Sequence, residues 1–167
     1  HQRSPMEIWR EKLAIDTTPE SIAEVLGTLP SFTTTGAYED RAILHIAVPD
    51  QGALKHSYEA QFAKEFTDKS DTLRGRFGIV DWHIINYEGL NEKPGIGNRD
   101  SDGPQKGGLK VVFTGSQGDA KGFIWMRGSG TEPVFRVLAD ICGNDEVGEA
   151  WLLDWHKNLI DKASNRL

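Results

Sequence analysis

Apolar side chains recur at helical spacing in two segments of the chain. One segment spans residues 52 to about 69, and the apolar residues that lie four positions apart in it are Leu54, Tyr58, Phe62 and Phe66. The other begins at a cap formed by Asn144 or Asp145, and its apolar residues are Val147, Trp151, Trp155 and Leu159. Residues four apart lie above one another on a helix, so each segment predicts an amphipathic helix with one face in the core.

Several shorter segments are rich in β-branched and aromatic residues, which is typical of strands. They span residues 42–48, 79–89, 109–113, 122–126 and 134–141. In the last of them, alternation puts a set of apolar residues on one face of the strand, namely Phe135, Val137, Ala139 and Ile141. Residues 90–108 are rich in glycine and therefore predict a long loop.

From residue 40 onward the predicted order is strand, helix, four strands and helix. Such an order favours an antiparallel sheet with the helices on one of its faces, which is an α+β fold. Residues 1–31 predict a helical preface to this domain, because Met6, Trp9 and Leu13 fall on one helical face.

Composition narrows the class of protein. A chain of 167 residues with 38% apolar residues is long enough for one domain. The net charge of −6 argues against nucleic acid or an anionic membrane surface as a partner. A single cysteine, Cys142, excludes an internal disulfide framework, and no apolar run reaches the roughly 20 residues that span a bilayer. We therefore expect a cytoplasmic protein that contacts neither nucleic acid nor membrane.

The most informative chemistry lies in residues 126–137, MRGSGTEPVFRV. Arg127 and Arg136 bracket a loop between two predicted strands, and their planar guanidinium groups suit the oxygens of a phosphate. A phosphate monoester dianion is the natural ligand of this set. The alternative is an ordinary hairpin loop whose arginines pair with surface carboxylates such as Glu132.

The residues between the two arginines support an anion site. Gly128 and Gly130 can adopt backbone angles that turn successive N–H groups into one concavity. Ser129 and Thr131 add hydroxyl donors. We therefore expect this loop to surround a bound anion.

The motif R-G-S-G-T-E-P, followed by Arg136, resembles the phosphate-binding loop in the C-terminal domain of the α-D-phosphohexomutases, the family that contains phosphoglucomutase and phosphomannomutase. Weaker similarity runs through LPSFTTTGAYEDRAILHI and GGLKVVF, so the resemblance covers about residues 30–165. It implies that the substrate phosphate is bound by Arg127, Ser129, Gly130, Thr131 and Arg136. Gly128 would have a conformational role, and Glu132 and Pro133 would shape the loop.

The resemblance also implies an architecture. Residues 32–167 would form the C-terminal phosphate-binding domain of a phosphohexomutase, with a TATA-binding-protein-like fold, and residues 1–31 would be a helical linker from a preceding domain. Enzymes of the phosphoglucomutase type interconvert glucose 1-phosphate and glucose 6-phosphate, with Mg²⁺ and a sugar 1,6-bisphosphate activator. Their three preceding domains would be the partners of this one.

The motifs that carry the family's chemistry are absent from these 167 residues. The chain contains neither the Ser-x-Ser-His nucleophile nor the Asp-x-Asp-x-Asp-Arg magnesium loop, and it lacks the Glu-x-Ser-Gly loop that reads sugar hydroxyls. We therefore expect no catalytic residue and no metal ligand here, and no mutase activity from this chain alone. Its expected role is to hold the non-reacting phosphate of the sugar phosphate and to help close the cleft. A phosphomannomutase or another phosphohexomutase remains an alternative, as does a stand-alone anion-binding or interaction module.

Overall fold

The computed structural model describes residues 27, 29–88, 91–96 and 107–167. The chain divides into two compact units, His1–Ser31 and Phe32–Leu167. The helical linker predicted over residues 1–31 lies almost wholly outside the described residues, and so does most of the loop predicted over residues 90–108. Both therefore stay predictions.

The unit Phe32–Leu167 is an α+β domain, as the sequence predicts. Within its described residues, seven strands form one sheet with only antiparallel strand pairs. The strands are β1 (Phe32–Thr34), β2 (Ile43–His45), β3 (Asp81–Glu88), β4 (Asn91–Pro94), β5 (Leu109–Thr114), β6 (Ala120–Gly128) and β7 (Val134–Cys142). The helices are α3 (Gln51–Asp68), α4 (Ser70–Phe77) and α5 (Glu146–Ser164), and a short 3-10 helix spans Asp40–Ala42.

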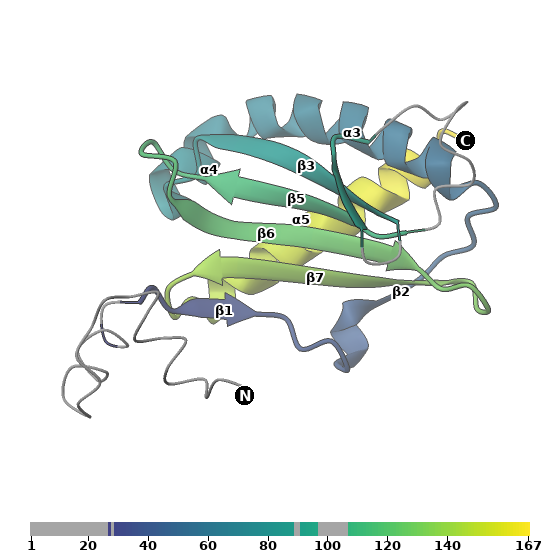
Figure 1. Ribbon diagram of the computed structural model, residues 1–167, viewed down its shortest axis with the longest axis horizontal. Helices are drawn as coiled ribbons and strands as arrows, with labels where there is room; N and C mark the ends of the chain where they lie inside the picture. Colours follow the sequence, from purple (N-terminus) through teal and green to yellow (C-terminus); the bar gives the residue numbers. More distant parts are fainter. Residues whose placement is uncertain (1–26, 28, 89–90, 97–106) are drawn as a thin grey trace, which may run out of the picture. The chain divides into compact units, whose positions relative to one another are not determined.

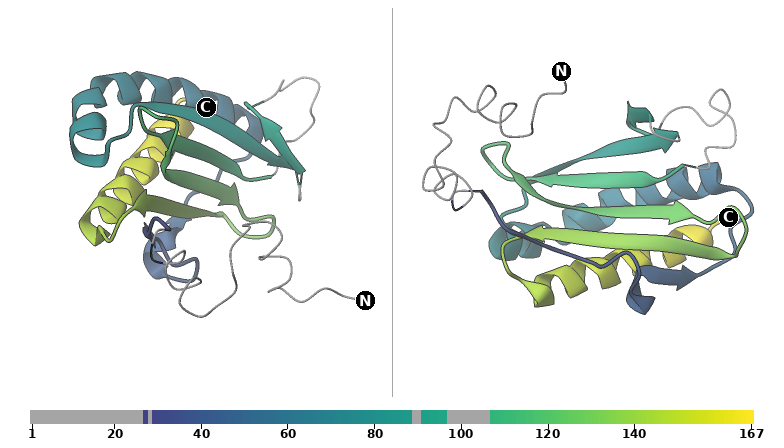
Figure 2. Two further views of the ribbon diagram at one scale, coloured as in Figure 1. Left: turned by 60° about the vertical axis from the view of Figure 1, so that its left-hand side comes forward. Right: turned by 60° about the horizontal axis from the view of Figure 1, so that its bottom comes forward.

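The sheet has the order β1-β7-β6-β5-β3-β4, and β2 also pairs with β7 (Figure 1). β1 lies beside the end of β7 and β2 beside its beginning, so both follow the same edge. α3, α4 and α5 lie on one face of the sheet, as the two further views show (Figure 2). The opposite face of β3, β5, β6 and β7 is called the open face below.

The core fills the space between the helices and the sheet. The predicted α3 stripe is confirmed, because Leu54, Tyr58 and Phe62 are completely buried. On β7 the predicted apolar face is confirmed too, since Phe135, Val137, Ala139 and Ile141 are all buried. The prediction for α5 is wrong at one position: Val147 is 70% exposed, because it lies in the first turn of the helix and away from the sheet, whereas Trp155 and Leu159 are buried.

Side-chain caps begin both long helices. The Asp50 carboxylate accepts a 2.8 Å hydrogen bond from the Ala53 N–H at the start of α3. The Asp145 carboxylate accepts one of 2.7 Å from the Gly148 N–H at the start of α5, which decides between the two predicted caps. Each cap satisfies one of the N–H groups that the first turn of a helix leaves without a partner.

The predicted element order is wrong in three places. α4 follows α3 directly, and the sequence conceals it because Leu73 and Phe77 are its only buried residues. β4 was expected to be part of a loop, since all four of its residues are exposed; it exists because it pairs with β3. The strand expected at residues 42–48 is only three residues long, because Ala42 belongs to the 3-10 helix.

None of the described helices has the combination of length and apolar character that crossing a membrane requires.

Candidate functional site

Arg127 and Arg136 are directly opposite each other in the antiparallel register of β6 and β7. Their neighbours Met126 and Val137 point into the core, so both arginines project from the open face. Residues opposite each other have Cβ atoms about 4.5–5.5 Å apart. The folding of this hairpin therefore brings together two positive charges that are nine residues apart in the sequence.

Neither guanidinium has a carboxylate partner among the described residues. Both side chains are exposed, and the interaction found there is a 3.4 Å hydrogen bond from Arg136 to the carbonyl of Ala37. The alternative in which the two arginines pair with carboxylates such as Glu132 is thus not realised in the described part of the chain. Like charges directly opposite on a sheet are unfavourable unless an anion lies between them.

The loop that joins the two strands is organised by Ser129. Its N–H donates to the carbonyl of Val134 over 2.9 Å, which closes the loop at its base. Its hydroxyl oxygen accepts hydrogen bonds from the N–H groups of Thr131 and Glu132, at 3.4 and 3.2 Å. Two backbone donors of the loop therefore converge on the Ser129 hydroxyl. The bonds are long for N–H···O contacts, so an anionic oxygen would be a stronger acceptor.

The predicted conformational role of the loop glycines is wrong. Neither Gly128 nor Gly130 has a φ in the left-handed region. Gly128 is buried, and a Cβ there would lie 2.4 Å from the Gln51 side-chain nitrogen at the start of α3. A side chain at this position would displace the end of the Gln51 side chain. A Cβ at Gly130 would meet no heavy atom within 4 Å.

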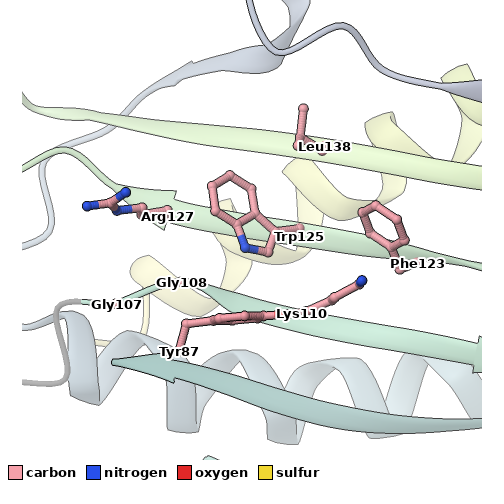
Figure 3. A pocket seen from close by; sticks show the side chains of 8 residues that line it. All are labelled: Tyr87, Gly107, Gly108, Lys110, Phe123, Trp125, Arg127 and Leu138. Carbon is pink, nitrogen blue, oxygen red and sulfur yellow. The ribbon is translucent and has the colours of Figure 1, made fainter. Parts of the chain in front are cut away.

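A cavity of about 350 Å³ lies on the open face next to Arg127 (Figure 3). Its other walls are the side chains of Tyr87, Lys110, Phe123, Trp125 and Leu138 and the backbone of Gly107 and Gly108. Apart from Arg127, the sequence reasoning missed these residues. The signal that could have found them is the spacing of two along β6, which puts Phe123, Trp125 and Arg127 on one face.

Positive charge gathers around this cavity although the whole chain is acidic. The Lys110 ammonium lies 4.0 Å from the centre of the Phe123 ring, a cation–π contact. Arg127 is the second cationic side chain that lines the cavity, and Arg136 projects from the same face of the sheet. The Tyr87 hydroxyl donates a 2.8 Å hydrogen bond to Glu92, which fixes the ring at the rim of the cavity.

Beneath the cavity, His156 of α5 forms hydrogen bonds with both β6 and α3. The His156 Nε2 lies 3.0 Å from the Trp125 carbonyl, and its Nδ1 lies 2.7 Å from the Tyr58 hydroxyl. A carbonyl can only accept, so Nε2 carries the proton and Nδ1 accepts from Tyr58. Burial lowers the pKa of His156 to about 4, which keeps the ring neutral.

The residues described here do not include any cluster of three or more histidine, cysteine, aspartate or glutamate side chains placed to hold a metal ion. Arginine forks, backbone N–H groups and hydroxyls are groups that can donate hydrogen bonds to an anion.

A comparison with known proteins finds no matching family model, no similar curated protein and no similar solved structure. The resemblance to the phosphohexomutases therefore stays a prediction, and it depends on the residues of the loop between β6 and β7.

Proposed function

We propose that residues 32–167 form a phosphate-binding domain whose site consists of Arg127, Arg136 and the loop that joins them. The observation that carries the proposal is the register of β6 and β7, which sets the two arginines opposite each other with no described carboxylate between them. A dianion held between the guanidinium groups removes their repulsion and accepts charge-assisted hydrogen bonds from both.

A phosphate monoester suits this site better than a carboxylate does. It has three terminal oxygens and two charges, so two arginines and further donors can bind it together. The Ser129 hydroxyl, the Thr131 hydroxyl and the N–H of Gly130 are the further donors of the proposed site. Ser129 already holds the loop in a turn, so little ordering is needed when the anion binds.

We further propose that the domain serves a phosphohexomutase, most similar to a phosphoglucomutase, and that its fold is TATA-binding-protein-like. The motif R-G-S-G-T-E-P followed by Arg136, between two adjacent strands, supports this proposal. The domain would hold the non-reacting phosphate of a sugar phosphate, such as glucose 1-phosphate or glucose 6-phosphate. Binding energy from that phosphate would orient the sugar for chemistry in the three preceding domains, where Mg²⁺ and the activator would act.

The test is the affinity of the chain for inorganic phosphate and for glucose 6-phosphate, measured by calorimetry or by chemical-shift titration. Arg127→Ala and Arg136→Ala should each weaken both ligands at least about tenfold, because one charge-assisted hydrogen bond contributes ~1.5–3 kcal/mol. Arg74→Ala is the matched control, since it removes an exposed arginine from α4 on the other side of the sheet. Unchanged affinity in both site variants would sink the proposal.

A further inference from the structure

Trp125 lies two residues before Arg127 on the same strand and on the same face of the sheet. The separation of such residues is about 6.5–7 Å. In Figure 3 the flat face of its indole is turned away from the helices, and the guanidinium of Arg127 is directed away from the indole. A ligand bound to the arginine pair thus has a broad aromatic surface immediately beside it.

The indole N–H of Trp125 has no hydrogen-bond partner within the described residues. It points to Gly108, where a Cβ would lie only 2.8 Å from the indole nitrogen. A side chain would not fit at Gly107 either, because its Cβ would lie 1.5 Å from the Tyr87 carbonyl oxygen. Two successive glycines therefore make this wall of the cavity out of backbone, and the absence of a side chain at Gly108 leaves room for the indole edge.

The other rings of the cavity already have polar partners. Lys110 lies over the ring of Phe123, and the hydroxyl of Tyr87 is bonded to Glu92. By contrast, no ring or cation of the described residues stacks on Trp125. The backbone below it is held by His156, so the indole has a fixed support and an unused face.

We propose that this cavity binds the organic ring of the phosphate monoester whose phosphate lies on Arg127 and Arg136. The ring stacks on Trp125, and the indole N–H and the Lys110 ammonium donate to its polar atoms. A volume of about 350 Å³ is within the range of small-molecule pockets. The ligand chemistry is a ring with one flat face, either the C–H face of a pyranose or a heteroaromatic base. The inference rests on the proposed function, because the arginine pair must bind phosphate first.

Four ligands separate the contribution of the ring from that of the phosphate. Inorganic phosphate and glycerol phosphate have no ring, whereas glucose 6-phosphate has a pyranose and adenosine monophosphate has a base. At least one of the two ring-bearing ligands should bind the unmodified chain about fivefold or more tightly than glycerol phosphate does, since stacking contributes ~1–3 kcal/mol per ring. Which of the two is favoured identifies the ring.

Trp125→Ala should remove this advantage and leave the affinity for inorganic phosphate unchanged. Trp125→Phe should keep part of the advantage, and it remains a valid test if the alanine variant does not fold. Val112→Ala is the control, because Val112 lies on the open face of β5 but not in the cavity. Equal affinities of all four ligands for the unmodified chain, or an equal loss of all four in Trp125→Phe, would overturn the inference. Failure of the proposed function looks different, because inorganic phosphate itself would then not bind.

Discussion

The helix-covered face and the open face of this sheet differ in whether their charged side chains have partners of opposite charge. On the helix side of the sheet, buried carboxylates have partners: Glu65 pairs with Lys162 at 2.6 Å and Glu149 with Arg41 at 2.5 Å, and both cationic side chains are themselves exposed. Lys55 donates a 2.6 Å hydrogen bond to Asn86. On the open face, Arg127 and Arg136 are opposite each other without a carboxylate among the described residues.

This difference follows from what each face must do. A charge under the helices loses its water when the chain folds, so it must find its partner within the fold. The two arginines of the open face are exposed, so they keep their water and can exchange it later for a ligand. Stability and ligand binding should therefore depend on different residues of the same strands, and substitutions should separate them.

The largest expected change in the free energy of unfolding comes from a substitution on the helix-covered face. Phe62 is completely buried and lies among aromatic rings, with centroids 4.8 Å from Trp82 and 5.3 Å from Trp155. Phe62→Ala should lower the free energy of unfolding by about 3–5 kcal/mol, as truncation of a core aromatic ring does. Urea unfolding measures the loss. In the folded fraction, affinity for inorganic phosphate should not change.

The control for Phe62→Ala is Val147→Ala on α5, at a side chain that is 70% exposed. It should change the free energy of unfolding by no more than about 0.5 kcal/mol. A phosphate affinity that fell together with stability in Phe62→Ala would show that the two faces are coupled.

A change of pH should have an intermediate effect on the free energy of unfolding. Burial lowers the pKa of His156 from 6.5 to about 4, so between these values the unfolded chain binds more protons than the folded chain. Stability should therefore rise with pH across this window and be lost as pH falls from about 6.5 to about 4. The full difference is about 3 kcal/mol, from ~1.4 kcal/mol per pKa unit.

Urea unfolding at several pH values checks this dependence. His156→Gln should flatten the curve, whereas His83→Gln, at an exposed position on β3, should leave its slope in place. If the slope between pH 4 and 6.5 persisted in His156→Gln, the neutral buried imidazole would not be its source.

The smallest expected change in stability lies on the open face. Arg136→Glu places a carboxylate opposite Arg127, so repulsion becomes attraction, and the free energy of unfolding should increase by about 0.2–1 kcal/mol. Binding of inorganic phosphate should be lost in the same variant. Thermal unfolding and calorimetry measure the two effects, and Arg74→Glu provides the same charge change away from the site. A variant that is destabilised but still binds phosphate would contradict the comparison.

Much of the fold could be predicted from local patterns. The stripe of apolar residues on α3 and the alternation on β7 each have one solution, because helical and extended backbones repeat at 3.6 and 2 residues. α4 and β4 could not be predicted. The former has only two buried residues, and the latter has none and forms only where β3 is already in place.

The residue types of the proposed site could be read from the sequence, but their arrangement could not. The arginines and the hydroxyl residues of the loop are visible in the sequence, and they indicate an anion. Trp125, Lys110 and Tyr87 come from three different strands, so only the pairing of those strands brings them together. The role expected for Gly128 was wrong for a similar reason, since its close neighbour is the side chain of Gln51, 77 positions earlier in the chain.

The sequence by itself determined the α+β class, most of the helix-facing residues of the long elements and the residue types of 127–136 from which an anion site is proposed. These properties depend on residue types and on short spacings, which the backbone geometry converts directly into faces and loops. Only the tertiary structure decided that the two arginines are direct cross-strand neighbours and that an unused indole lies beside them. Register and the packing of distant segments set those positions, and they are properties of the folded sheet rather than of any single segment.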